Sequence, residues 1–252
     1  MTALKLASRG LLAAALLAGL AGAAHAADDI DRVNLEGTLG QERIGMSLLV
    51  KNGKSFDGGH YFYGRYLKDI PLRGKLQGET LLLSEPGGGV FKLRFKSNGS
   101  ADGQPLSFDN SVGLDGDWTL KTKTLPVMLT MGDMAPASEG RWYRDVTEES
   151  DAAFEARVQG FQRAALAGQA QQASRYVHFP LRINHKGGSR QIANARQLQA
   201  EWSDIFTPAY LELLKQPMPH NLFVRNGQGQ AMLGSGVAWF DAKGAAALNL
   251  PD

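Results

Sequence analysis

Histidine is the residue type in this chain best suited to acid–base or metal chemistry near neutral pH. Beyond the first 26 residues there are four: His60, His178, His185 and His220. None forms a close helical pair with another and no HExxH motif occurs, so the spacing predicts no metal site. His178 and His220 each precede or open a predicted strand near the C-terminus, where they could meet at the mouth of one domain, or simply be polar strand ends.

A glycine-rich stretch, GQGQAMLGSG at Gly227–Gly236, has the glycine spacing of a phosphate-binding loop. Ser235 and Gly236 stand where lysine and Ser/Thr are needed, and the following residues VAWF favour a strand, so no helix N-terminus is available. We therefore predict a hairpin turn at its start and no nucleotide or other cofactor. Gly234 then falls within a predicted strand, which indicates a bend or a close approach by a neighbour.

Several polar and aromatic residues of the C-terminal region could line a ligand pocket. The candidates for ligand binding are His178, Arg182, Tyr210, His220 and Trp239. No GxSxG motif occurs and the chain has no cysteine, so a thiol nucleophile is excluded. We assign no catalytic residue.

The segment HYFYGRY, residues 60–66, is dense in aromatic side chains. Alternation along a strand predicts two faces, Phe62, Gly64 and Tyr66 on one and Tyr61, Tyr63 and Arg65 on the other. An exposed face of Tyr61, Tyr63 and Arg65 would suit contact with a partner protein or glycan. The alternative is a domain interface or cross-strand packing, because aromatic residues favour strands in any case.

Prolines flank Met218 just before His220. Pro217 and Pro219 most simply end the preceding helix and set the entry into the next strand. The sharper interpretation is a rigid rim that presents Met218 and His220 to a ligand.

The N-terminus predicts export. Lys5 and Arg9 precede an apolar run from Leu11 to about Leu20, and Ala24-His25-Ala26 resembles a cleavage site. We expect residues 1–26 to be a cleaved signal peptide and the mature chain to be periplasmic or secreted. The run is too short for a membrane anchor.

Composition excludes some function classes. Loss of Lys5 and Arg9 leaves 25 of the 27 basic residues against 25 acidic ones, which is no excess for binding nucleic acid. With no cysteine there is no disulfide and no lipid-anchoring thiol.

Residues 27–145 are predicted to form a β-rich domain. Ile44, Met46, Leu48 and Val50 alternate in one strand, Asn52-Gly53 follows as a hairpin turn, and similar short runs continue to LPVMLTM without a helical stripe. This is typical of an all-β antiparallel meander, a small barrel or sandwich.

Residues 146–252 are predicted to form an α+β domain, since the period changes near Asp145–Ser150. Three capped helices are predicted, with N-caps at Thr147 or Ser150, at Asn194 and at Thr207, and a short helix through Ala173 to Val177 could follow the first. A hairpin precedes the helix at Asn194, and three strands, NLFVR, QAMLGSGVAWF and GAAALNL, complete an antiparallel sheet.

The order of these elements resembles the cone-shaped fold of the nuclear-transport-factor-2-like superfamily, in which helices pack across a curved sheet and leave a pocket. The stretches FPLRIN, IFTPAY and MLGSGVAWF also resemble recurring features of uncharacterised secreted bacterial proteins with such a domain. On other chains this fold carries acid–base enzymes, but no family dyad matches here, and pairing of two copies through a sheet is an expectation from the resemblance.

These features favour an exported, non-enzymatic binding protein of the cell envelope, one version of which is an inhibitor or immunity protein against a secreted enzyme. The alternative is a C-terminal pocket that holds a small apolar ligand or performs acid–base chemistry. An interior filled by Trp202, Phe206, Tyr210 and Trp239 would leave no room for that ligand.

Overall fold

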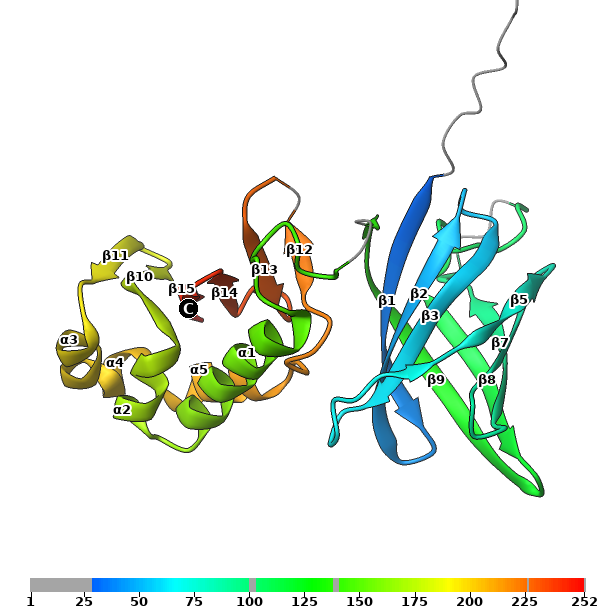
Figure 1. Ribbon diagram of the computed structural model, residues 1–252, viewed down its shortest axis with the longest axis horizontal. Coiled ribbons are helices and arrows are strands. Elements are labelled where there is room, and N and C mark those ends of the chain that lie inside the picture. The colour runs from blue at the N-terminus through cyan, green and yellow to red at the C-terminus, as the bar shows by residue number, and fades with distance from the viewer. Residues whose placement is uncertain (1–28, 100–102, 138–140, 226, 252) are drawn as a thin grey trace, which may run out of the picture.

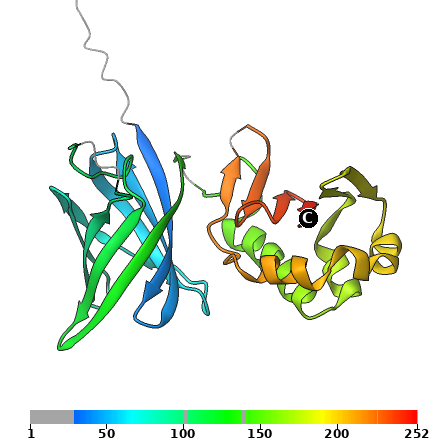
Figure 2. The ribbon, with the colours of Figure 1, turned by 180° about the vertical axis from the view of Figure 1, so that it is seen from behind.

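The computed structural model describes residues 29–99, 103–137, 141–225 and 227–251, so the predicted signal peptide lies outside the described residues. Figures 1 and 2 show two regions side by side, a large sheet at one end and a second sheet with all the helices at the other. We call residues 29–137 the barrel and residues 141–251 the C-terminal half. No helix in the described ranges is both long and apolar enough to cross a membrane.

The barrel contains nine strands: β1 (Ile30–Leu39), β2 (Glu42–Lys51), β3 (Ser55–Tyr63), β4 (Ile70–Pro71), β5 (Arg73–Gln77), β6 (Thr80–Ser84), β7 (Val90–Lys96), β8 (Gly113–Leu120) and β9 (Lys123–Pro136). Their order is β4-β3-β2-β1-β9-β8-β7-β6-β5 and the pairs are antiparallel. Because β3 also contacts β5, the sheet is nearly closed. An antiparallel β-rich N-terminal region is confirmed.

Alternation explains the barrel's core. Ile44, Met46, Leu48 and Val50 are all buried on β2, as predicted. The three-residue turn that follows has φ of 52° at Asn52 and 65° at Gly53, the left-handed conformation common in hairpin turns. Alternate side chains of the other strands meet these four residues in the core of the barrel.

The C-terminal half contains α1 (Asp151–Leu166), α2 (Ala170–Ala173), the 3-10 turn η1 (Ser174–Tyr176), β10 (Val177–His185), β11 (Gly188–Ile192), α3 (Ala195–Ala200), α4 (Trp202–Ile205), α5 (Pro208–Lys215), β12 (Phe223–Arg225), β13 (Gln230–Leu233), β14 (Ala238–Asp241) and β15 (Gly244–Asn249). The sheet order is β11-β10-β15-β14-β13-β12. The expectation of a purely antiparallel sheet is wrong at one pair, since β10 and β15 are parallel. The crossover through α3, α4 and α5 allows this pairing.

Side-chain caps begin three helices where the sequence predicts them. Ser150 accepts from Ala153 N, Asn194 from Gln197 N and Thr207 from Tyr210 N. Each bond satisfies a backbone N–H that the first helical turn leaves unpaired. The single helix expected after Asn194 is instead interrupted at Glu201, which separates α3 from α4.

The predicted strand QAMLGSGVAWF is two strands. Gly234 and Gly236 have φ of 56° and 95°, so the chain turns there and β14 returns beside β13. The expected close approach is present, because a Cβ on Gly234 would lie 2.9 Å from Pro217 Cβ.

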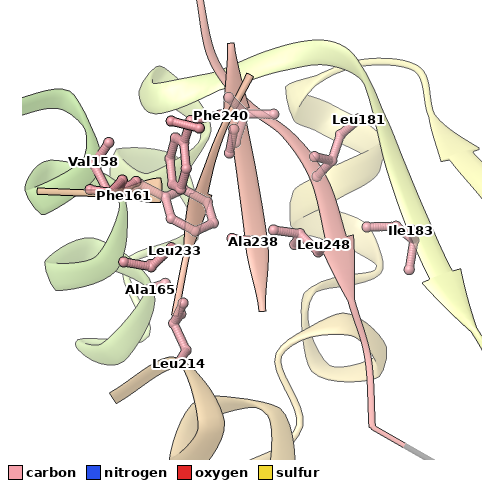
Figure 3. Close-up of a cluster of buried hydrophobic side chains, with 14 of the residues drawn as sticks. Val158, Phe161, Ala165, Leu181, Ile183, Leu214, Leu233, Ala238, Phe240 and Leu248 are labelled. Carbon is pink, nitrogen blue, oxygen red and sulfur yellow. The ribbon is translucent and has the colours of Figure 1, made fainter. Parts of the chain in front are cut away.

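The interior between the helices and the second sheet is filled. Figure 3 shows Val158, Phe161 and Ala165 of α1 facing Phe240, Leu233 and Leu248 of the sheet. Phe161 and Phe240 meet edge to face at 5.5 Å between ring centroids, and Tyr210 packs against Phe206 at 5.7 Å. The predicted ligand space of a cone is therefore occupied by side chains that belong to the core.

Candidate functional site

Helix α1 carries a polar stripe beside its apolar one. Glu155, Gln159 and Gln162 are spaced at i, i+4 and i+7, so they share one face of the helix. The Gln162 amide donates to two backbone carbonyls at the end of α5, at 2.8 and 2.9 Å, and Glu155 Oε1 accepts from Asn221 N at 2.9 Å. These bonds hold the loop between α5 and β12, which carries His220.

His220 lies between two carboxylates at the seam between the barrel and the C-terminal half. Its Nε2 is 2.7 Å from Asp69 Oδ1 and its Nδ1 is 2.5 Å from Glu155 Oε2, the latter an ion pair without a well-aligned hydrogen bond. Burial lowers the pKa of His220, but bonds and charges from Asp69 and Glu155 outweigh it and raise the pKa to about 9. His220 is therefore an imidazolium at neutral pH.

His60 and Asp69 approach from the barrel, His60 on β3 and Asp69 just before β4. His60 Nε2 is 3.3 Å from Asp69 Oδ1 and 2.5 Å from the side-chain nitrogen of Asn221. Burial lowers the pKa of His60 more than Asp69 raises it. Burial also raises the pKa of Asp69, but the hydrogen bond from His220 and the charges of both histidines bring it below its ordinary value. One neutral and one charged imidazole thus share one carboxylate; we call His60, Asp69, Glu155 and His220 the seam cluster.

Residues before α1 brace the seam cluster. Tyr143 OH donates to Glu155 Oε1 at 2.8 Å and accepts from Leu222 N at 2.9 Å, and burial raises the pKa of this hydroxyl well above 10, so it stays a donor. The neighbouring Trp142 donates to Leu222 O at 3.1 Å, and the Arg32 guanidinium lies 3.4 Å from the centre of its ring. A barrel strand is thereby bound to the start of the C-terminal half.

A cleft of about 700 Å³ lies beside the seam cluster, with walls from both regions. Asn34, Gln216, Asn221 and Asn249 contribute amide groups, whereas Met131, Leu213, Phe223, Met232, Val237 and Leu250 contribute apolar surface. Glu36 and Arg43 line the cleft as a mutual ion pair at 2.8 Å. Asp133 and His220 also line the cleft, so it combines amide groups, apolar side chains and charged groups that have partners in the protein.

Of the five predicted ligand-binding residues, His220 is the one that lines this cleft. Tyr210 is fully buried in the core and donates to Val237 O at 3.0 Å. Trp239 alternates with buried Ala238 and Phe240, so it faces the other side of the sheet.

The other two predicted candidates lie on the second sheet. His178 Nδ1 is 2.5 Å from Asp241 Oδ2, and Arg182 is exposed and donates to Asn184 Oδ1 at 2.8 Å. His178 and His220 thus have separate carboxylate partners, and no common site forms between them. Met218, expected at a rim, lines the cleft together with His220, although most of its side chain is buried with its sulfur against Gly64.

The predicted exposed face of Tyr61, Tyr63 and Arg65 is wrong for Tyr61. Tyr61 is only 1 % exposed, and its hydroxyl donates to Glu85 inside the barrel. Arg65 is exposed and pairs with Glu42 at 3.3 Å, but β3 ends at Tyr63, so strand alternation does not extend to it. The other face of β3 makes the contact between the two regions, because Phe62 packs edge to face on the His220 ring at 4.4 Å.

Sequence reasoning left His60, Asp69 and Glu155 unassigned. His60 and Asp69 carry no spacing motif, because their partner His220 is more than 150 residues away. Glu155 did carry a signal: an acid followed at helical spacing by Gln159 and Gln162, next to a fully apolar stripe.

In comparisons with known proteins, no family model, curated protein or solved structure matches this chain.

Proposed function

We propose that the chain is an exported, non-enzymatic binding protein that holds a small ligand in the cleft between the barrel and the C-terminal half. The observation that carries the proposal is the cleft itself, whose volume of about 700 Å³ falls within the range of small-molecule sites. Export rests on the N-terminal sequence. We also propose a nuclear-transport-factor-2-like fold for residues 146–252, supported by helices packed across a six-stranded sheet.

The lining indicates the chemistry of the ligand. The charged residues of the lining already have partners in the protein: Glu36 pairs with Arg43, Asp133 accepts from Asn34, and His220 pairs with Asp69 and Glu155. A charged ligand would have to compete with these contacts. The amide of Gln216 suits a hydroxyl, amide or carbonyl group, whereas those of Asn34 and Asn249 already hydrogen-bond within the protein. The methionine side chains adapt to irregular apolar shapes. We therefore expect an uncharged molecule with an apolar body and a few hydrogen-bonding groups.

Support for binding without catalysis comes from His220, the histidine that lines the cleft. A general base near the cleft must accept a proton, but His220 already carries one at neutral pH and is held by Asp69 and Glu155. The enzymatic alternative placed its active site in a pocket inside the C-terminal half, but core side chains pack that interior.

Native mass spectrometry of the mature chain, purified from the envelope fraction of its host, tests the proposal. We expect a mass increment of a few hundred daltons on the wild-type protein. Ser235→Trp places an indole at the cleft wall and should remove the increment, whereas Ser189→Trp, on exposed β11, should retain it. A bare wild-type chain, or an increment that survives Ser235→Trp, would overturn the proposal. An increment of polypeptide size, or a doubled mass, would replace the small ligand by a protein partner or a second copy.

A further inference from the structure

We propose that His60, Asp69 and His220 bind one divalent transition-metal ion, of which zinc is the best match, at the seam between the barrel and the C-terminal half. Two imidazole nitrogens and a carboxylate oxygen lie within 4.8 Å of one another. Imidazole suits zinc and other first-row transition metals, and three protein ligands with a remaining open position are typical of zinc. This inference does not depend on the ligand of the cleft.

The distances are close to those of a coordination shell. Ligand atoms bound to zinc at about 2.0–2.1 Å in tetrahedral geometry lie about 3.3 Å apart. His60 Nε2 and Asp69 Oδ1 are already 3.3 Å apart, and His220 Nε2 is 2.7 Å from the same oxygen. Insertion of an ion needs the second distance to open by roughly half an ångström. The Asp69 side chain is half exposed, so it is free to make this movement.

Glu155 gives His220 the orientation that a metal ligand needs. Metal-binding histidines usually donate the other ring N–H to a carboxylate, which fixes the tautomer. Glu155 Oε2 lies 2.5 Å from His220 Nδ1, while Glu155 Oε1 is itself fixed by Tyr143 OH and Asn221 N. This contact is an ion pair rather than an aligned hydrogen bond, but it places the carboxylate beside Nδ1, so Nε2 is the nitrogen left for the ion.

The charges also balance. Both histidines coordinate as neutral imidazoles, so binding of the ion releases any proton on their coordinating nitrogens to solvent. The two carboxylates, Asp69 and Glu155, then carry the two negative charges that compensate a dication in this partly buried place.

Asn221 is suited to the fourth position. Its side-chain amide is 2.5 Å from His60 Nε2, and an amide turned by 180° would direct its oxygen toward the ion. Asn221 has a left-handed backbone with φ of 52°, a conformation that asparagine adopts more readily than most other non-glycine residues. Water could take the same position from the side on which Asp69 is exposed.

Such an ion would fasten the two regions to each other. His60 and Asp69 belong to the barrel, whereas His220 belongs to the loop after α5, so the ion sets the spacing of the cleft walls.

Isothermal titration of the EDTA-treated mature chain with ZnCl2 tests the site. We expect one Zn²⁺ per chain, affinity at least about 100-fold weaker in Asp69→Asn, and affinity about 10–100-fold weaker in Glu155→Gln. His178→Ala is the matched control, because His178 is also a part-buried histidine with a carboxylate at 2.5 Å, and it should bind zinc as the wild type does. Circular dichroism establishes that each variant is folded.

Cobalt gives a readout that needs no variant, since Co²⁺ in a nitrogen- and oxygen-ligated site of low coordination number absorbs visible light more strongly than hexaaqua Co²⁺. We expect this absorption at one equivalent, and its loss on addition of one equivalent of Zn²⁺. No stoichiometric zinc binding by the wild type, unchanged affinity in Asp69→Asn, or loss of binding in His178→Ala would each overturn the proposal.

Discussion

The core of the C-terminal half and the seam beside it are built from two faces of the same helix. The apolar face of α1 presents Phe154, Val158 and Phe161, all fully buried, to the second sheet. The adjacent face presents Glu155 and Gln162, which are almost as deeply buried, to the loop that carries His220. One helix therefore both completes the fold and positions the candidate site.

The two faces differ in how they stabilise the molecule. Apolar contacts are non-directional and sum over buried area, so the core depends on shape and volume. A buried carboxylate stabilises the structure only while its partners are present, and Glu155 has hydrogen bonds from Tyr143 and Asn221 and an ion pair with His220. The core tolerates conservative exchange, whereas the seam depends on the identity of each partner.

The largest effect is expected in the core. Phe161→Ala removes a fully buried ring and should lower the free energy of unfolding by about 3–5 kcal/mol, through lost burial and the cavity left behind. Leu213→Ala, on the exposed cleft wall, should change it by about 0.5 kcal/mol or less. Urea denaturation followed by circular dichroism measures both. A cost below about 1 kcal/mol for Phe161→Ala would mean that the interior of the C-terminal half is not tightly packed. The ligand could then bind in that interior instead of in the cleft.

Local patterns were sufficient for most of the fold. The stripe Phe154, Val158, Phe161 and the cap at Ser150 predict α1 because helical periodicity and capping act within a few residues. The prediction of one continuous strand through GSG was wrong. The alternation of residue types continues across this segment, but the backbone turns at Gly234, next to Pro217. That contact depends on the end of α5, a different element.

The seam cluster could not be predicted from local sequence patterns either, because it also depends on contacts between distant segments. His60 and His220 come together only once β3 and the loop after α5 are placed, and neither segment encodes the other. Tyr61 was misplaced because alternation separates the faces of a strand but does not say which face turns inward. In the folded barrel, Tyr61 faces Glu85 and Phe62 faces the seam.

Two glycine substitutions can separate the steric cost of a new methyl group at the cleft wall from the cost of a strained backbone. Gly234 and Gly227 both have positive φ, 56° and 70°, but a new Cβ meets Pro217 at 2.9 Å in the first and nothing within 4 Å in the second. We expect Gly227→Ala to cost about 1 kcal/mol and Gly234→Ala about 2–3 kcal/mol in unfolding free energy. Equal costs would show that the wall yields to the methyl group and that the seam is looser than the core.

The smallest effect concerns a carboxylate on the barrel side of the cleft. Burial raises the pKa of Asp133 above 3.8, more than the hydrogen bond from Asn34 and the charge of Arg32 lower it. The folded protein therefore binds this proton more tightly than the unfolded chain does. The resulting stabilisation is complete at a pH below the unfolded value of 3.8 and is lost as the pH rises through the folded value.

Asp133→Asn removes this pH dependence while an amide oxygen still accepts from Asn34. Melting temperatures of wild type and variant, recorded in EDTA between about pH 4 and pH 7, should diverge in favour of the variant as the pH rises. We expect no such pH dependence from the core of the C-terminal half, because its apolar side chains do not titrate in this range. A difference that stays constant or shrinks with rising pH would mean that Arg32 and Asn34 fully compensate the buried charge, and that the seam, like the core, is stable without regard to protonation at this position.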